Sequence, residues 1–152
     1  MNDSQLLSEL LGLPNVHVRS YQLKGSSSIE LTIDSTAEAG VCPTCGQVSQ
    51  LRHEQGERQA IRDLAMWSRQ CVLKYAPYRF KCAGCQATFV ERVVWRTAGV
   101  SYTVRYEQHV YERVRRESMA QVAQDEGLSE DRVQAIFLRW AKKRSKCGGI
   151  RS

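Results

Sequence analysis

Four of the six cysteines in this 152-residue chain form two C-x-x-C pairs, C-P-T-C at 42–45 and C-A-G-C at 82–85. A tight turn at each pair points two thiolates at one position, and Pro and Gly help the backbone to bend there. Two such turns brought together form the tetrahedral four-thiolate cage that Zn²⁺ prefers. We therefore expect a zinc-ribbon-like domain with one structural Zn²⁺. Its ligands would be Cys42, Cys45, Cys82 and Cys85.

The remaining cysteines and a nearby histidine are weaker candidates for ligands. His53 could replace one thiolate, but its acidic neighbours favour a surface position. Cys71 alternates with apolar residues and is expected to be a packed thiol, whereas Cys147 is expected to be exposed in a polar tail. A single C-x-x-C pair would also fit a redox dithiol. Two pairs favour a metal, and the 36 residues between them require a substructure over 47–81.

The first part of the chain predicts a helix and two hairpins. Asp3 or Ser4 can cap a leucine-rich helix that Gly12 ends. Apolar residues then alternate with polar ones over 16–23 and 29–33, on either side of a Gly-Ser turn, as in a β-hairpin. The same alternation over 71–75 and 78–82 predicts a second hairpin that reverses near Ala76-Pro77.

The pattern becomes helical after Thr103 and has the spacing of a helix-turn-helix. Ser118 can cap a helix that ends at Glu126, and Gly127 lies where the turn needs a positive φ. Ser129 can cap a second helix, whose apolar stripe is Val133, Ile136, Phe137 and Trp140. An earlier helix over 104–116 would complete a three-helix unit. The alternative interpretation is a helical hairpin packed into a larger core.

The outward face of the second helix favours DNA binding. This face includes Ala135, and Arg132 and Gln134 near the N-terminus could reach base edges in the major groove. Basic residues further along would meet phosphates. These are Arg139, Lys142, Lys143, Arg144 and Lys146. Glu130 and Asp131 would repel the DNA backbone, although carboxylates also stabilise a helix N-terminus.

The net charge of +6 lies in the last two-thirds of the chain. Residues 1–41 have a net charge of −3, whereas residues 42–100 carry +5 and residues 101–152 carry +4. The chain has 16 arginines against six lysines, which suits planar anionic partners such as phosphate. No apolar run approaches the length of a membrane span, and the start lacks the features of a signal peptide. We therefore expect a cytoplasmic protein without a membrane partner.

Several short motifs resemble those of a known family. They are C-P-T-C-G at 42–46, I-R-D-L at 61–64, Y-R-F-K-C-A-G-C at 78–85 and T-F-V-E at 88–91, followed by the helix-turn-helix. Together they resemble the N-terminal zinc-binding and helix-turn-helix region of ISL3-family insertion-sequence transposases, over roughly residues 5–143. One departure is A-M-W-S at 65–68, where the family usually has Pro and then Gly.

The resemblance implies binding to the terminal inverted repeats of an insertion sequence, in bacteria. It also implies a catalytic domain of the DDE type in family members, but this chain stops at Ser152. Its late acids, Asp125, Glu126, Glu130 and Asp131, cluster in one helix-turn-helix. We therefore expect no catalytic residues and no enzymatic activity from this chain. Possible protein partners are a second copy or a full-length transposase.

The expected fold class is α+β, a small β-hairpin and zinc-ribbon module followed by a three-helix helix-turn-helix module. The expected segments are a helix and hairpin (1–41), a zinc ribbon (42–100), a helix-turn-helix (101–145) and a tail (146–152). In the ribbon, basic residues would track adjacent phosphates. These are Arg58, Arg62, Arg79 and Lys81.

Other functions stay open from sequence alone. The first alternative is a free-standing zinc-ribbon and helix-turn-helix transcriptional regulator. The second is an adaptor whose ribbon binds a protein and whose chain touches no DNA. A redox enzyme based on the C-x-x-C pairs is a third, and it would hold no metal.

Overall fold

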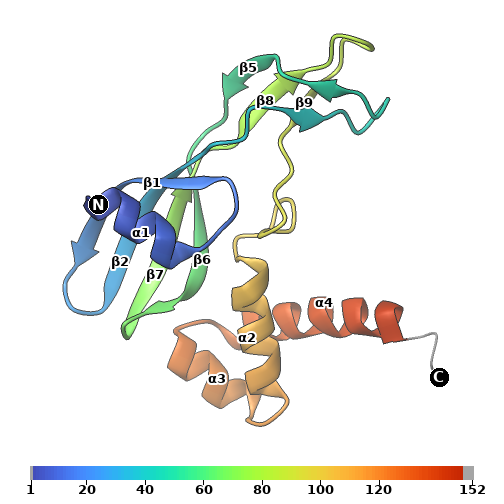
Figure 1. The fold of residues 1–152 in the computed structure, drawn as a ribbon. Coiled ribbons are helices and arrows are strands. Elements are labelled where there is room, and N and C mark those ends of the chain that lie inside the picture. The colour runs from blue at the N-terminus through green and yellow to red at the C-terminus, as the bar shows by residue number, and fades with distance from the viewer. Residues whose placement is uncertain (1, 149–152) are drawn as a thin grey trace. The chain divides into compact units, whose positions relative to one another are not determined.

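The computed structural model describes residues 2–148 of the chain, with side chains through Lys146, so the expected position of Cys147 lies outside the described side chains. The chain forms two compact units, one up to Thr103 and one from Val104 onward. The structure confirms the α+β class, with four helices and small sheets among the described residues (Figure 1).

The N-terminal unit is built on a four-stranded sheet. Its strands are β1 (Val16–Lys24), β2 (Ser28–Ser35), β6 (Gln59–Met66) and β7 (Arg69–Tyr75), in the order β1-β2-β7-β6. β1 and β2 form the expected antiparallel hairpin, and β2 then pairs with β7 in parallel. The sheet therefore combines the N-terminal hairpin with strands that lie between the two C-x-x-C pairs.

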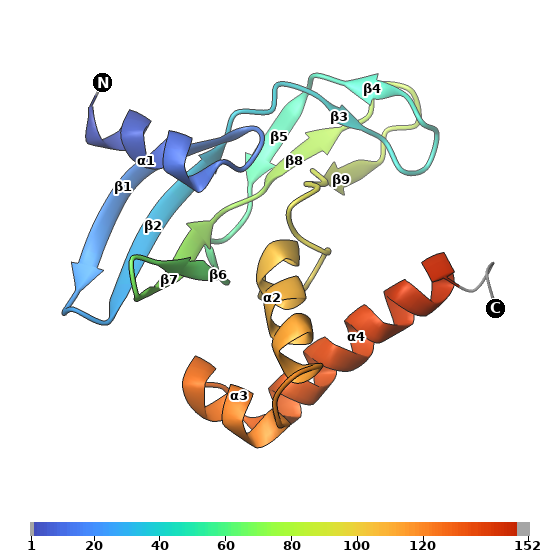
Figure 2. The same cartoon turned by 60° about the horizontal axis from the view of Figure 1, so that its bottom comes forward.

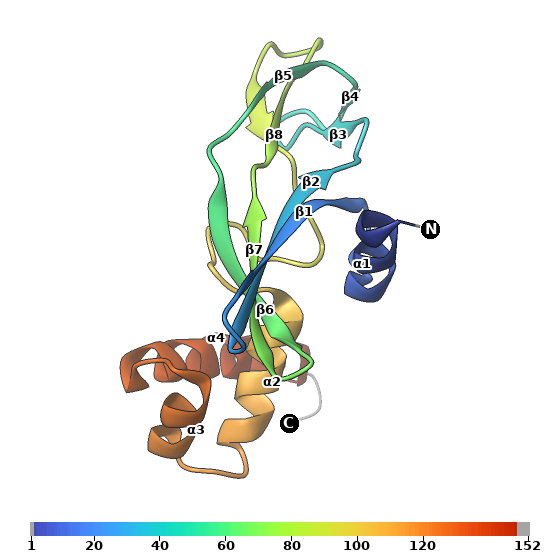
Figure 3. The same cartoon turned by 90° about the vertical axis from the view of Figure 1, so that its left-hand side faces the viewer.

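One face of this sheet carries the core of the unit. Helix α1 (Asp3–Leu11) lies on one face of the sheet, where Leu11 is buried (Figure 3). The N-cap is Asn2, one residue before the expected Asp3 or Ser4, and Gly12 ends the helix with a φ of 67°. The sheet contributes the other buried side chains. They are Val18, Ile29, Leu31, Ile33, Ile61, Cys71, Leu73 and Tyr75, joined by Trp95. Cys71 is therefore the packed thiol that the alternation predicts.

The second predicted hairpin is wrong. Its two segments are strands, but β7 pairs with β2 and β6, whereas β8 (Tyr78–Lys81) belongs to another sheet. The chain crosses from one sheet to the other at Ala76 and Pro77, which are both buried. Alternating burial predicts a strand without naming its partner, and a proline cannot donate to a ladder. The actual hairpin is β6–β7, which reverses at Trp67 and Ser68.

The second part of this unit is the zinc ribbon (Figure 2). β8 lies between β5 (Arg52–Gln55) and β9 (Thr88–Val90), with antiparallel pairing on both sides. β3 (Gly40–Val41) and β4 (Val48–Ser49) form a separate two-stranded ladder. The segment between the cysteine pairs is therefore filled by ribbon strands and by the β6–β7 hairpin of the larger sheet.

A buried carboxylate joins the ribbon to the sheet. Glu91 follows β9 and is buried. Its oxygens accept hydrogen bonds from the Tyr75 hydroxyl at 2.7 Å, the Ser35 hydroxyl at 2.7 Å and the Tyr78 N–H at 3.0 Å. Burial and the hydrogen bond to Glu91 raise the pKa of Tyr75 above its ordinary range. Glu91 of the T-F-V-E run is thus a structural residue.

The C-terminal unit is a three-helix arrangement. α2 (Val104–Val114), α3 (Met119–Glu126) and α4 (Glu130–Gly148) follow one another along the chain. Their shared core is Tyr106, Val110, Val122, Ala123, Val133 and Ile136. α2 ends two residues before the expected boundary, and α4 extends into the expected tail. Each helix within residues 2–148 is too short or too polar to cross a lipid bilayer.

Candidate metal centre and nucleic-acid interface

The two C-x-x-C pairs form two turns of the same construction. In the first turn, the Gly46 N–H donates to the Cys42 carbonyl and the Cys42 N–H donates to the Gln47 carbonyl, both at 2.8 Å. In the second turn, the Gln86 N–H donates to the Cys82 carbonyl at 2.9 Å. The Cys82 N–H donates to the Ala87 carbonyl at 2.8 Å. The residue after the second cysteine has a positive φ in both turns, 77° and 65°. The sequence thus builds the same thiolate-presenting turn twice.

The four sulfurs converge on one point. All four Sγ atoms lie within 4.8 Å of one another. Cys42 Sγ lies 3.6 Å from Cys85 Sγ, and Cys45 Sγ lies 3.4 Å from Cys82 Sγ. A tetrahedral Zn²⁺ with bonds of about 2.3 Å separates its sulfurs by about 3.8 Å. The donor set therefore fits a structural zinc ion, and the expected four ligands lie together.

In each turn, the pKa of the first cysteine is lowered and the pKa of the second is raised. The backbone N–H of Cys45 lowers the pKa of Cys42 to about 6, and the backbone N–H of Cys85 likewise lowers the pKa of Cys82. The pKa of Cys45 is raised, because the hydrogen bond with Cys82 and burial outweigh the lowering effect of the Gln47 N–H. Four neighbouring thiols cannot all ionise without a cation, and a bound Zn²⁺ provides the charge that lets them do so.

A small group of closely packed side chains surrounds the cysteines. Phe80 stacks on Phe89 with ring centroids 5.8 Å apart, and these rings pack with Cys42 and Cys82. A Cβ at Gly84 would lie 2.2 Å from the side-chain oxygen of Gln47, which belongs to the other turn. A core of this size does not supply much stability, so the metal is the main source of order in the ribbon.

The helix-turn-helix has the capping that its sequence predicts. The Ser118 hydroxyl accepts from the Gln121 N–H, and the Ser129 hydroxyl accepts from the Arg132 N–H at 3.2 Å. Gly127 has a φ of 68°, the left-handed value that the turn requires. The Gln121 side chain donates to Asp125 instead of closing the capping box. These contacts fix where α4 begins and which of its side chains face outward.

A cluster of charges ties α2 to α3. Arg113 of α2, whose side chain is 16% exposed, pairs with Glu117, Asp125 and Glu126 at 2.6 to 3.1 Å. Hydrogen bonds from Arg113 lower the pKa of both Glu117 and Asp125. Glu126 also accepts from the Tyr106 hydroxyl at 2.8 Å. Arg113 is therefore a structural arginine of this unit.

The structure places the predicted base-reading residues on the exposed side of α4. Arg132, Gln134 and Ala135 are exposed, as is Lys142 two turns later. They stand on the side opposite the buried Val133 and Ile136. The first two turns of α4 thus present a guanidinium, an amide and a methyl group to solvent.

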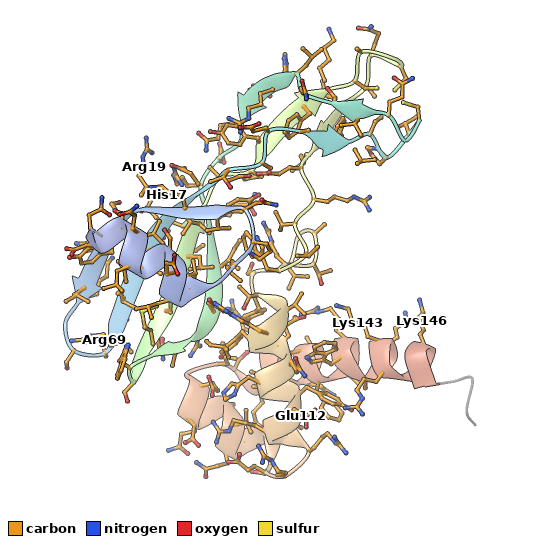
Figure 4. All side chains as sticks on the ribbon, in the orientation of Figure 1. His17, Arg19, Arg69, Glu112, Lys143 and Lys146 are labelled. Atoms are coloured by element: carbon orange, nitrogen blue, oxygen red, sulfur yellow. The ribbon has the colours of Figure 1, made fainter. Side chains whose placement is uncertain are left out.

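The other basic residues of α4 interact with side chains of the same unit, some more closely than others. Arg139 Nε donates to Glu107 Oε2 at 2.8 Å. Lys143 Nζ lies 5.2 Å from the ring centroid of Trp140, and Arg144 lies 3.4 Å from the exposed Glu112. Lys143 and Lys146 stand on the C-terminal half of α4 (Figure 4). The Arg139 side chain therefore has a structural role, whereas the charged groups of the later residues remain accessible to solvent.

The predicted phosphate contacts of the ribbon fall into two groups. Arg79 and Lys81 lie on β8 of the ribbon and are exposed. Arg58 and Arg62 lie at the four-stranded sheet, where Arg62 belongs to β6. The Arg58 guanidinium donates to the carbonyl of Ile33 and pairs with Asp34 at 2.9 Å. The structure does not bring the four side chains into one cluster.

Sequence reasoning missed Leu138 on α4. Its side chain is 56% exposed, and it follows Gln134 and Ala135 by one helical turn. A signal was present, because Leu138 falls outside the stripe formed by Val133, Ile136 and Trp140. An apolar side chain on this face could contact a thymine methyl group.

Two family models match the chain. Residues 97–141 match the helix-turn-helix domain of transposase family ISL3, and residues 38–85 match the zinc-finger of transposase IS204/IS1001/IS1096/IS1165. Neither a curated protein nor a solved structure gives a significant match. The first model covers all of α2 and α3 and most of α4, and the second contains all four clustered cysteines.

Proposed function

We propose that this chain, which carries the zinc-finger and helix-turn-helix segments of the N-terminal region of ISL3-family transposases, recognises the terminal inverted repeats of an insertion sequence. The single observation that carries the proposal is the exposed face of α4. Arg132 lies in its first turn and Gln134 begins its second turn, with Ser129 as the cap, so their side chains are available at the end that reads base edges in helix-turn-helix proteins.

The two ends of this face have different roles. Arg132 would bind guanine O6 and N7, Gln134 would bind adenine N6 and N7, and Ala135 would contact a thymine methyl. Lys142, Lys143 and Arg144 would bind phosphates and set the register of α4 on the duplex. Arg139 holds α4 against Glu107 of α2, so it would orient the reading helix from within the protein.

The zinc centre would support binding without taking part in chemistry. Cys42, Cys45, Cys82 and Cys85 would hold one Zn²⁺, with no ligand position left for a substrate. The metal orders β8, and β8 carries Arg79 and Lys81. These two exposed side chains would bind phosphates of the DNA.

The proposal is tested with Arg132→Ala and Gln134→Ala on duplexes that carry the terminal repeat or a scrambled sequence. Each substitution should reduce the preference for the repeat by roughly 5- to 150-fold, the equivalent of 1–3 kcal/mol per bidentate contact. Gln108→Ala, an exposed glutamine on α2, is the matched control and should leave the preference unchanged. Unchanged preference in both α4 variants would refute the proposed reading face.

The same assay separates the alternative functions. Preference for a sequence outside the element's ends, lost in the α4 variants, would identify a free-standing transcriptional regulator. Affinity that does not fall with salt, or no binding to DNA, would favour a protein-binding adaptor, because phosphate contacts make affinity depend on salt.

A further inference from the structure

The turn between β6 and β7 has a backbone conformation that its residues do not favour. Met66 pairs with Arg69, so Trp67 and Ser68 form a two-residue turn. Their φ values are 52° and 67°, both in the left-handed region. Two-residue turns of this kind favour Asn, Asp and Gly, because these residues tolerate a positive φ. An indole side chain at the first position therefore costs free energy that Asn or Gly would not.

The side chain held by this strained turn is exposed. Trp67 is 85% exposed, whereas Trp95, in the core of the same unit, is 5% exposed. A strained turn that holds a large apolar group in solvent lowers stability twice, through its backbone and through its unburied surface. Burial of the indole within the protein does not offset either of these costs.

A second turn lies beside the first. Because β2 runs parallel to β7, the β1–β2 turn and the β6–β7 turn reach the same end of the sheet (Figure 1). The Gln70 N–H donates to the Ser27 carbonyl at 2.8 Å, which joins the two turns directly. Arg69 stands at this end of the sheet (Figure 4). The two turns together form one surface, residues 24–28 and 66–70, which we name the Trp67 end.

The composition of the Trp67 end suits a polyanion. It carries Lys24 and Arg69, and it contains four serines but no aspartate or glutamate. The nearest carboxylate along β2 is Glu30, which pairs with Lys24 at 3.0 Å. Basic groups and hydroxyls bind phosphate oxygens, and an exposed aromatic ring between them can stack on a base.

We propose that the Trp67 end is a second DNA contact, in which the Trp67 indole stacks on a base that is unstacked from the duplex while Lys24, Arg69 and the serine hydroxyls bind phosphates. This inference rests on the proposed binding of DNA by α4. Stacking needs no particular base, because every base has a π-face. The Trp67 end therefore adds affinity without sequence preference, and α4 provides the preference.

The test uses the full chain with zinc and a duplex that carries the terminal repeat. Trp67→Asn places a residue that tolerates a positive φ in the turn, so its thermal midpoint should rise above that of the wild type. Its affinity for DNA should fall by roughly 5- to 150-fold, the range for one lost base stack, with the preference over scrambled DNA unchanged. A weaker binder that is also more stable cannot owe its loss of affinity to unfolding.

Two controls accompany this variant. Trp67→Phe keeps an aromatic ring and should keep most of the affinity. Val94→Ala removes another highly exposed apolar side chain of the same unit and should leave affinity unchanged. DNA should also quench the tryptophan fluorescence of the wild type more strongly than that of Trp67→Phe, because stacking on a base quenches an indole.

The outcomes separate this inference from the proposed function. Wild-type affinity in Trp67→Asn would overturn the inference alone, while loss of preference in Arg132→Ala still supported α4. If the wild type bound no DNA, both proposals would fail. If Trp67→Asn instead dissociated a dimer in sedimentation and bound DNA as before, the Trp67 end would be a contact between two copies, which also overturns the inference.

Discussion

Arg139 of α4 and Glu107 of α2 form an ion pair in which the glutamate side chain is 3% exposed. The pair lies between the helix that would read DNA and the helix that supports it. Arg139→Met leaves the Glu107 carboxylate buried without its cation, which should destabilise the protein by about 3 kcal/mol. Arg144→Met breaks the exposed pair with Glu112 and an exposed contact with the Tyr111 ring, and should cost about 1 kcal/mol. Urea unfolding of both variants measures the difference, and equal costs would show that the buried pair has no special role.

Substitution of a cysteine inside the zinc centre and of one outside it should have different effects on the zinc content of the protein. The purified protein should contain about one zinc per chain, and Cys42→Ser or Cys82→Ser should lose it. Cys71→Ser should retain the metal, because Cys71 is buried in the sheet core away from the cluster. Metal analysis of the three variants tests the assignment. Loss of zinc in Cys71→Ser, or its retention in the other two, would contradict it.

Glu91 predicts that one carboxylate supports both the sheet and the ribbon. Glu91→Ala leaves the hydroxyls of Tyr75 and Ser35 and the Tyr78 N–H without their acceptor. The expected loss is about 3 kcal/mol, because each buried unsatisfied donor costs about 1–3 kcal/mol and some regain water. Tyr75→Phe removes one hydrogen bond and should cost about 1 kcal/mol. Denaturant unfolding with zinc present measures both losses. A Glu91→Ala variant as stable as the wild type would exclude this structural role.

The Arg113 cluster predicts an acid-sensitive helical unit. Burial raises the pKa of Glu126, but hydrogen bonds from His109, Tyr106 and Arg113 lower it by more, and Arg113 lowers the pKa of Asp125. A lowered pKa in the folded state stabilises the fold above the ordinary carboxyl pKa of about 4, and this stabilisation is lost as pH falls through the lowered value.

The measurement is the thermal midpoint between pH 6 and pH 2 for the wild type and Arg113→Met. The variant should be less stable at pH 6, and the difference should shrink as the pH falls below about 4, because its carboxylates no longer have their pKa lowered by Arg113. Zinc release in acid is common to both proteins and cancels in the comparison. A constant difference across this range would show that the cluster does not couple stability to pH.

Local signals in the sequence were sufficient for much of this fold. Ser118, Gly127 and Ser129 predict the helix-turn-helix because caps and a positive-φ glycine act within a few residues. The cysteine pairs predict the metal centre because each turn is local, and two of them suffice for a tetrahedral site. The match of both segments to family models confirms these interpretations.

Strand partners and side-chain partners could not be predicted in this way. The alternation over 71–75 is correct, but only the tertiary structure shows that β7 lies between β2 and β6. Arg139 resembles a phosphate ligand in the sequence, since nothing local indicates that Glu107 lies 32 residues earlier at hydrogen-bond distance. The β6–β7 hairpin could not be predicted, because Trp67 and Ser68 are not typical residues of a two-residue turn.

The central claim is that α4 distinguishes the ends of an insertion sequence from other DNA. The most direct measurement is the ratio of the wild-type dissociation constants for a scrambled duplex and for a terminal-repeat duplex of equal length, at physiological salt. Sequence-specific proteins of this kind show ratios of about 10³ or more. We predict such a ratio for this chain and its loss in Arg132→Ala combined with Gln134→Ala. A wild-type ratio near one would contradict the account.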